Sequence, residues 1–236
     1  MSEEIKKVGK EIKVEYTGSY GFINASDDKN TKFFDDEDDI GKKELSKSKI
    51  KDIKMYTKII NGKNCIIGIE YTIRSLYNGK DLVVSHKVAN EFDDYKHLEL
   101  SSGEYLKEII VRFPNNVQYI SQLGFITTKN NRIMAGEEEG EIKQIDMNEG
   151  KNIILGMSGY IGDKLSCIGC SYTSKKEFAS SILFKFFLLR HLIKKDEEFK
   201  KKWDEKYNEL SPEFKMIWRT VNLPDNCFNI IVNTCL

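Results

Sequence analysis

The sequence predicts an all-β body built from three similar repeats, followed by a helical extension at its C-terminal end. The repeats appear when Gly68, Gly124 and Gly169 are treated as equivalent positions, which lie 56 and 45 residues apart. Each glycine is preceded by an isoleucine fifteen residues earlier and followed by a threonine four residues later. The isoleucines are Ile53, Ile109 and Ile154. Internal self-similarity predicts a fold more strongly than a single motif does, so three copies, each a pair of strands, indicate a threefold β architecture.

The expected strands follow one another with turn residues between them. In the N-terminal segment 1–30, three apolar residues between positions 12 and 16 alternate with charged residues, which predicts one strand. The first repeat, residues 50–75, contains Asn61-Gly62 between two apolar alternating segments, a strong indication of a β-hairpin. Residues 76–102 form a looser connection with two strand-like segments, DLVVSH and HLEL.

The second and third repeats complete the predicted body. The second repeat, 105–128, turns at Pro114-Asn115-Asn116, and a further turn at 129–132 leads to the acidic loop GEEEGE. The third repeat starts as a strand at Ile154 and resumes as a strand at Leu165. Between them we expect a glycine-rich loop, because three glycines fall within seven residues, at Gly156, Gly159 and Gly162.

The composition changes beyond Ser174. Five apolar residues between positions 178 and 193 are spaced by steps of four, four, three and four, which places them on one helix face. The pattern continues to Leu210, and Ser211-Pro212-Glu213 predicts the start of a short further helix. A strand-like apolar tail ends the chain. We therefore divide the chain into an N-terminal segment (1–30), a β body (31–175) and a helical extension (176–236).

The charges of the chain are balanced. The 236 residues include 37 basic and 37 acidic side chains, so the chain lacks the positive charge typical of proteins that bind nucleic acid. The charged N-terminal residues do not resemble a secretory signal, and the longest apolar run, 182–193, is too short and too charged for a transmembrane segment. With five cysteines and no signal sequence, we expect reduced thiols and a cytoplasmic protein.

Four segments together are similar to one known family. They are Phe34-Asp35-Asp36, the run from Leu98 to Gly103-Glu104-Tyr105, the hairpin sequence FITTKNNRIMAG at 125–136, and the glycine-rich stretch from Ile154 to Thr173. In this order, and across residues 31–175, the chain resembles the jacalin-type lectins. The resemblance implies a β-prism, in which three four-stranded Greek-key sheets surround one core.

The resemblance also implies a position for a carbohydrate site. In the family, sugar hydroxyls are held by a carboxylate, by backbone amides of the same loop and by a glycine in the first-strand loop, where a glycine pair normally precedes Phe-Asp-Asp. The carboxylate position corresponds here to Ser166, whose short neutral hydroxyl cannot form the charge-assisted pair of hydrogen bonds. Asn30 and Thr31 stand near the position of the glycine pair. The candidate sugar-binding residues are Gly159, Tyr160, Gly162, Asp163, Lys164, Leu165 and Ser166.

Two functions are compatible with the absence of the carboxylate and of the glycine pair. The glycine-rich loop of the third repeat could still bind glycans, with Asp163 or Ser166 as acceptor and Tyr160 as an apolar wall. Alternatively, the prism has kept its shape and serves as a protein-interaction or structural module. The missing sugar-binding residues and the added amphipathic extension favour the second function.

The sequence gives little indication of a redox, metal-binding or catalytic site. Cys167 and Cys170 are spaced like a redox or metal dithiol, but residues three apart on a strand point to opposite faces, so we expect ordinary buried thiols. The acidic run 35–39 lacks the glycine and closing glutamate of a calcium loop, and we expect a solvated turn. Three histidines show no metal-ligand spacing: His86, His97 and His191. Without a recognisable nucleophile elbow or phosphate-binding loop, we predict a protein that is not an enzyme and uses no cofactor or metal.

The helical extension has three interpretations. Its apolar face could cover part of the β body, or it could dock the body to a protein partner within a larger assembly. It could also lie on a membrane, but residues 178–193 lack the strongly basic opposite face of such helices. Large aromatic residues often anchor interfaces, which favours a protein partner. The candidate anchors are Phe178, Phe186, Trp203 and Trp218.

Overall fold

The fold is described from a computed structural model of the chain. The structure describes residues 13–21, 31–75, 79–115, 117–206, 215 and 219–223. They belong to two compact units. The β body comprises Val14–Leu76 and Lys80–Thr173, and the helical unit includes the segment from Ser174 onward.

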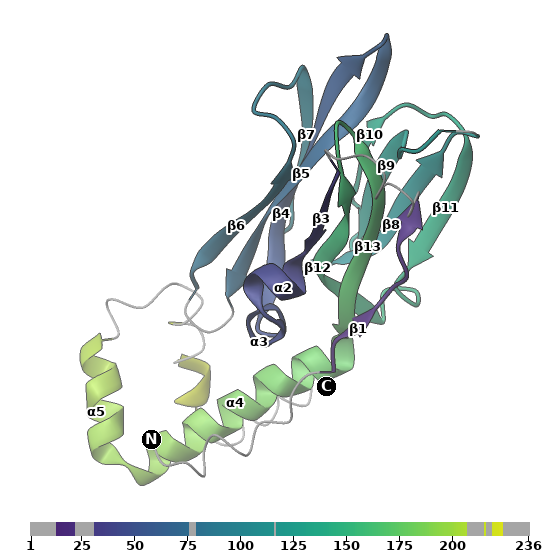
Figure 1. The fold of residues 1–236 in the computed structure, drawn as a ribbon. Coiled ribbons are helices and arrows are strands. Elements are labelled where there is room, and N and C mark those ends of the chain that lie inside the picture. Colours follow the sequence, from purple (N-terminus) through teal and green to yellow (C-terminus); the bar gives the residue numbers. More distant parts are fainter. Residues whose placement is uncertain are drawn as a thin grey trace. The chain divides into compact units, whose positions relative to one another are not determined.

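Two of the three sheets of the β body are Greek keys formed by consecutive strands (Figure 1). In each of them three strands follow one another as hairpins, and the fourth returns to pair with the first. The second sheet has the order β6-β5-β4-β7, and its strands are β4 (Ser48–Ile60), β5 (Lys63–Ser75), β6 (Asp81–Lys87) and β7 (Asp94–Glu99). The third sheet has the order β10-β9-β8-β11, and its strands are β8 (Leu106–Phe113), β9 (Gln122–Thr127), β10 (Arg132–Gly136) and β11 (Glu141–Asp146).

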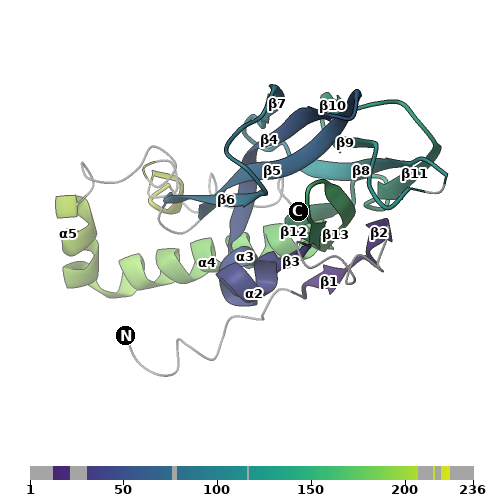
Figure 2. The ribbon, with the colours of Figure 1, turned by 45° about the horizontal axis from the view of Figure 1, so that its top comes forward.

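The first sheet joins the two ends of the β body. Its order is β1-β13-β12-β3, and the short strand β2 also pairs with β13 (Figure 2). Residues from all three sheets form one hydrophobic core, which confirms the predicted all-β prism. The strands of this sheet are β1 (Glu15–Tyr16), β2 (Tyr20–Gly21), β3 (Lys32–Asp35), β12 (Asn152–Ile161) and β13 (Leu165–Ser174).

The repeat read from the sequence corresponds to the central hairpin of each sheet. The three equivalent isoleucines lie on β4, β8 and β12, and all are buried. A Cβ atom on Gly68 would lie 2.5 Å from Cγ of Lys87, and one on Gly124 would overlap Sδ of Met134. In these two sheets the glycine therefore leaves a path for a long side chain of the neighbouring edge strand.

Several predicted turns are confirmed. Asn61 and Gly62 connect β4 to β5 with φ values of 53° and 77°, the left-handed conformation that an Asn-Gly hairpin turn requires. The turn at 129–132 connects β9 to β10, and Asn130 has a φ of 64°. The two strand-like segments of residues 76–102 are β6 and β7.

The structure differs from the sequence-based expectations at three places. The predicted glycine-rich loop is mostly strand, because β12 continues to Ile161 and contains Gly156 and Gly159. A Cβ atom on Gly159 would overlap the backbone carbonyl of Cys167, so close strand packing explains this glycine. The strand expected at 12–16 is present as the short β1, and the N-terminal segment adds a second short strand, β2, that we did not expect.

The acidic run is the third exception. It forms helix α2 (Asp36–Ile40), capped by Asp35, whose side chain accepts a 2.9 Å hydrogen bond from the amide of Glu37. Asp36 is completely buried, so the run is not a solvated turn. A second short helix, α3 (Lys42–Leu45), leads into β4.

The helical unit contains α4 (Lys175–Lys195) and α5 (Glu197–Lys206). These helices agree with the spacing of apolar residues beyond Ser174. Arg190 on α4 is buried and donates a hydrogen bond to the carbonyl of Val221. Among the described helices, none is long and apolar enough to cross a bilayer. The predicted helix start at 211–213 and the apolar tail lie outside the described residues.

Candidate ligand site at the hairpin 162–166

The candidate site lies at the end of the β12–β13 hairpin. Its turn is tight, because the amide of Gly162 donates a 3.0 Å hydrogen bond to the carbonyl of Lys164. Asp163 is exposed, Lys164 is half-buried, and Leu165 and Ser166 are buried. Of the residues to which the resemblance assigns sugar contacts, Asp163 therefore presents the most accessible side chain of this turn.

The structure brings the start of β3 to this turn. A Cβ atom on Gly162 would lie 2.9 Å from Oγ1 of Thr31, the residue that precedes β3. The two loops that the resemblance places together are thus adjacent here. However, a threonine side chain occupies the space beside Gly162 where the family pattern has a glycine. Asn30, the other departure from the pattern, lies outside the described residues.

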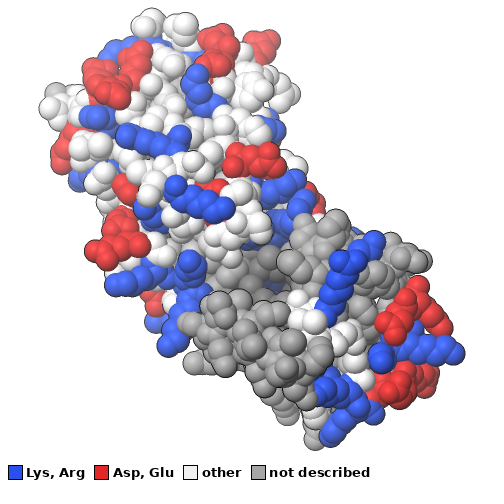
Figure 3. All heavy atoms as spheres, turned by 180° about the vertical axis from the view of Figure 1, so that it is seen from behind, with Lys and Arg blue, Asp and Glu red and all other residues white. Residues whose placement is uncertain are grey.

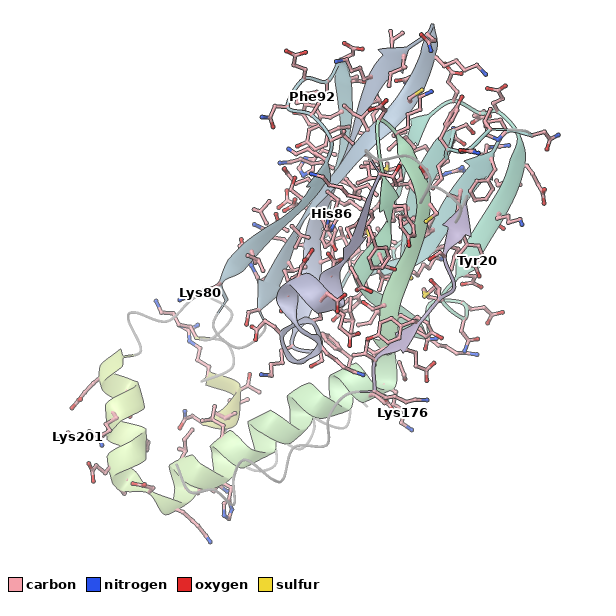
Figure 4. The ribbon with its side chains drawn as sticks, viewed as in Figure 1. Tyr20, Lys80, His86, Phe92, Lys176 and Lys201 are labelled. Carbon is pink, nitrogen blue, oxygen red and sulfur yellow. The ribbon has the colours of Figure 1, made fainter. Side chains whose placement is uncertain are left out.

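The N-terminal strand β2 lies against the backbone of Ser166. Cys167 and Ile168 on β13 pair with Gly21 and Tyr20 on β2, and a Cβ atom on Gly21 would overlap the carbonyl of Ser166. Figure 4 shows Tyr20 on this N-terminal segment. β2 is not predictable from the sequence, because a strand of two residues is too short to show an alternating pattern.

The loop between β8 and β9 borders the turn on another side. Nζ of Lys164 lies 4.1 Å from the ring centroid of Tyr119, a cation–π contact. The amide of Ile120 donates a 2.8 Å hydrogen bond to the carbonyl of Leu165. Lys164 is therefore held by an aromatic ring, and the backbone of Leu165 is fixed by a neighbouring repeat. Nothing in the sequence around Tyr119 indicated this contact.

An aromatic pair lies near this turn, on the paired strands β12 and β3. Tyr160 on β12 is directly opposite Phe33 on β3, and their ring centroids are 5.0 Å apart. Phe33 is 52% exposed. The apolar wall that we expected from Tyr160 alone is thus a two-ring surface.

The sequence and fold comparisons agree on one family. The family model for the jacalin-like lectin domain matches residues 27–171. The chain belongs to this family. No curated protein matches the chain.

Solved structures share the fold of this jacalin-like domain at low sequence identity. A mannose-binding jacalin-related lectin from Ananas comosus is 14% identical with a TM-score of 0.51, covering 68% of this chain and 98% of its own. Artocarpin, solved with methyl-α-mannose, is 20% identical with a TM-score of 0.51, covering 68% and 97%. Calystegia sepium agglutinin is 17% identical with a TM-score of 0.52, covering 68% and 97%.

The Gly-Glu-Tyr motif of the jacalin-like domain contains a buried, hydrogen-bonded carboxylate, that of Glu104. The Glu104 carboxylate accepts hydrogen bonds from the amide and hydroxyl of Ser101, at 2.9 and 2.6 Å. It also accepts bonds from the hydroxyl of Thr127 and from Nδ2 of Asn131, the latter at 2.7 Å. Although burial alone would raise it, these bonds lower the pKa of Glu104 to about 2. The motif therefore joins the start of β8 to the β9–β10 hairpin.

The Phe-Asp-Asp motif carries a second buried carboxylate. Oδ1 of Asp36 lies 2.9 Å from Nε2 of His86 on β6, and the other oxygen accepts a hydrogen bond from the amide of Met157 on β12. His86 points into the β body in Figure 4 and stacks on Phe34 with centroids 4.0 Å apart. Burial raises the pKa of Asp36, although its hydrogen bonds oppose that shift. Gly156 leaves room for this carboxylate, since a Cβ atom there would lie 3.1 Å from Oδ2 of Asp36.

The cysteines of the hairpin are free thiols in different surroundings. Cys170 belongs to the hydrophobic core, and burial raises the pKa of its thiol to about 12. Cys167 is also buried, and its pKa is raised by burial despite hydrogen bonds with Tyr160 and Ser19. Within the described ranges, no group of three or more histidine, cysteine or carboxylate residues is arranged to hold a metal ion.

The predicted partner-binding residues are only partly described. Phe178 on α4 is 2% exposed, so its ring is packed within the protein. Phe186 lies on α4 and Trp203 on α5, but their side chains are not among those that the structure describes. Trp218 lies outside the described residues. Partner binding through these aromatic residues stays a prediction.

Proposed function

We propose that this jacalin-like protein is a non-enzymatic binding module with a degenerate sugar site. In this proposal, it serves as a protein-interaction or structural component of the cytoplasm. The β-prism supplies a rigid scaffold, and the helical extension supplies contacts with a protein partner. The proposal extends the family membership, which by itself assigns neither a ligand nor a partner to the chain.

One observation carries the proposal. At the β12–β13 hairpin, Thr31 occupies the space beside Gly162, and a neutral serine stands at the position of the sugar-binding carboxylate. The Thr31 hydroxyl lies where a glycine would leave space beside Gly162. Ser166, at the carboxylate position, is buried and neutral. Hydrogen bonds to an ionised acceptor contribute about 1.5–3 kcal/mol, and two of them fix a sugar ring in one orientation. Their loss reduces affinity for a sugar by at least about tenfold.

The alternative is a functional lectin that uses a different acceptor. The exposed carboxylate of Asp163 and the exposed ring of Phe33 beside Tyr160 favour it. A sugar could then stack on the aromatic pair and donate a hydroxyl hydrogen bond to Asp163. Such a site would be more open than the one that the family pattern implies.

Calorimetric titration with methyl-α-mannose, the ligand in the artocarpin complex, distinguishes a degenerate sugar site from a functional one. We expect no binding by the natural chain and measurable binding by the double variant Thr31→Gly/Ser166→Asp, which restores space and carboxylate together. Thr31→Gly alone is the matched control, because it opens the space without adding an acceptor. Binding by the natural chain that disappears in Asp163→Asn would contradict the proposal and establish the alternative.

A further inference from the structure

In the part of the chain that the structure describes, the edge strand β6 has a partner strand on one side only. Among the described strands, β6 pairs with β5 alone, and it ends the sheet order (Figures 1 and 2). Its register with β5 runs without a shift from Arg74–Asp81 to Gly68–Lys87, whereas the β4–β5 and β8–β9 pairs both contain irregularities. The free side of β6 is therefore a regular strand edge.

The hydrogen bonds at both ends of β6 identify the groups that face outward. The amide of Ser75 donates to the carbonyl of Lys80, and the amide of Val88 donates to the carbonyl of Ile67. In an antiparallel pair, alternate residues bond to the partner strand, so the even-numbered residues of β6 bond to β5. The backbone groups of the odd-numbered residues then point away from the sheet. These residues are Asp81, Val83, Ser85 and Lys87.

The middle of this edge carries none of the usual protective features. Proteins normally protect an open edge with proline, a bulge, a short strand or charged side chains, because an open edge is a template for another strand. Here Leu82 and Val83 are 48% and 60% exposed, and charged residues stand only at the two ends of the strand.

The other described edges are less suited to strand pairing. β7 and β10 contact each other, β3 has four residues, and β1 and β2 have two each. β11 has six residues, but the charged side chains of Glu141, Lys143 and Asp146 are exposed along it. β6, with seven residues, is the longest edge strand of the β body that the structure describes.

We propose that β6 pairs with β6 of a second copy of this chain, antiparallel and about a twofold axis at Val84. This register places Val84 opposite itself, Val83 opposite Ser85 of the second copy, and Asp81 opposite Lys87 of the second copy. It is the symmetric register that pairs all four outward-facing residues. Isologous pairing of this kind closes on itself and leaves no edge open for further growth.

The charges at the two ends of β6 favour a second copy of this chain as the partner of its open edge. With the axis at Val84, the Asp81 carboxylate meets the Lys87 ammonium of the other copy twice, once at each end. Asp81 already accepts bonds from Arg74 at 2.6 and 2.9 Å and from Lys51 at 3.2 Å, but a carboxylate has about four acceptor positions. Lys87 binds Glu70 at 2.7 Å, and its Nζ lies 4.3 Å from the ring centroid of Tyr56, but an ammonium has three donors. Oppositely charged cross-strand neighbours stabilise a pair, whereas a shifted register would lose this match.

Apolar side chains add to the pairing. On the core-facing side of β6, the register sets the exposed Leu82 opposite His86 of the second copy and brings the two Val84 residues together. On the outer side, Val83 gains a neighbour in place of solvent. A single strand pair buries less than a standard interface of about 1,600 Å², so we expect a weak dimer whose population rises with protein concentration.

Sedimentation velocity of the full chain, from low micromolar to about 1 mM, measures this association. We expect the mass to rise from one chain to two, and Val83→Pro to remain monomeric throughout. Proline removes an amide that points to the open edge and leaves the β5 hydrogen bonds intact, which edge strands tolerate. Val83→Thr, of similar shape and with its amide, is the matched control and should dimerise like the natural chain.

Cysteine cross-linking tests the register and does not depend on how well the proline variant folds. Residues opposite each other on antiparallel strands have Cα atoms about 4.5–5.5 Å apart, within the range of a disulfide. Val84→Cys should therefore form a covalent dimer under oxidation, above the background of the natural chain. Val83→Cys alone should not, but a mixture of Val83→Cys and Ser85→Cys chains should.

Three results would overturn the proposal. A natural chain that stays monomeric at every concentration has no such interface, even if an extended peptide from another protein binds β6. A Val83→Pro variant that dimerises like the natural chain uses another surface. Cross-linking of Val83→Cys with itself would show a different register. None of these results depends on sugar binding, so the proposed function is tested separately.

Discussion

Two buried carboxylates show what single residues contribute to this domain. Glu104 and Asp36 belong to motifs that suggested the family, and each joins segments that are distant in the chain. Asp36 faces His86 and Met157, and Gly156 leaves the space that it occupies. A buried carboxylate needs hydrogen-bond donors around it, and here they come from segments that only the fold brings together.

Replacing Glu104 by glutamine tests how much the hydrogen bonds of its carboxylate stabilise the domain. Glutamine cannot accept all four hydrogen bonds, so we expect the free energy of unfolding at pH 7 to fall by about 1–3 kcal/mol. Because folding lowers the pKa of Glu104 from 4.5 to about 2, its stabilising effect is complete above pH 4.5 and is lost as the pH falls toward 2. The difference between the two proteins in urea unfolding should therefore shrink on acidification.

The exposed Glu141 on β11 provides the control for this comparison. Glu141→Gln should change the free energy of unfolding by less than about 0.5 kcal/mol. An equally large effect of both substitutions would show that the Glu104 hydrogen bonds contribute nothing specific.

At the scale of elements, the turns and hairpins of the prism depend on glycines of two kinds. Some adopt a left-handed backbone in open space, and others are also pressed against a neighbouring strand. Gly62, between β4 and β5, has a φ of 77° and no atom within 4 Å of an added Cβ. Gly140, before β11, has a φ of 91°, and its added Cβ would overlap the carbonyl of Phe113.

Alanine at these two positions should have different effects. Gly62→Ala introduces only the left-handed backbone strain, about 1–2 kcal/mol. Gly140→Ala adds a clash with backbone that cannot rotate away, so we expect a further loss of about 1–3 kcal/mol. Thermal and urea unfolding of the two variants measure the difference, and equal losses would show that the Gly140 turn can shift.

At the scale of the whole molecule, the β body closes by joining its two ends. β13 pairs with β12 and with the N-terminal strands β1 and β2, so the first sheet depends on residues far apart in sequence. Thr17, between these strands, exchanges hydrogen bonds with Cys170: its amide donates at 3.0 Å and its hydroxyl accepts at 2.9 Å. On the face that Figure 3 shows, acidic and basic side chains are interspersed, as the equal charge counts predict.

Truncation at the N-terminus tests this closure. Deleting residues 1–21 removes β1 and β2 and exposes one edge of β13, whereas deleting residues 1–12 leaves both strands in place. We expect the longer deletion to lower the midpoint of thermal unfolding by several degrees more than the shorter one, because about 1 kcal/mol corresponds to about 2–4 °C at this chain length. Equal midpoints would mean that β1 and β2 do not stabilise the first sheet.

The sequence by itself determined the threefold β architecture, most of the described turns and the helical character of α4 and α5. These features depend on local patterns: apolar alternation, an Asn-Gly turn with left-handed φ, and isoleucines and glycines that repeat at fixed separations. Each of them acts through neighbouring residues, and so it can be read along the chain.

Only the tertiary structure decided how distant segments meet. It placed Thr31 against Gly162, buried Asp36 beside His86, set β2 against the backbone of Ser166 and, among the described strands, paired β6 on one side only. An acidic run looks alike whether its carboxylates face water or a buried histidine. A seven-residue strand likewise does not show whether it lies inside a sheet or at its edge, because burial and pairing are set by segments that the chain brings together from far apart.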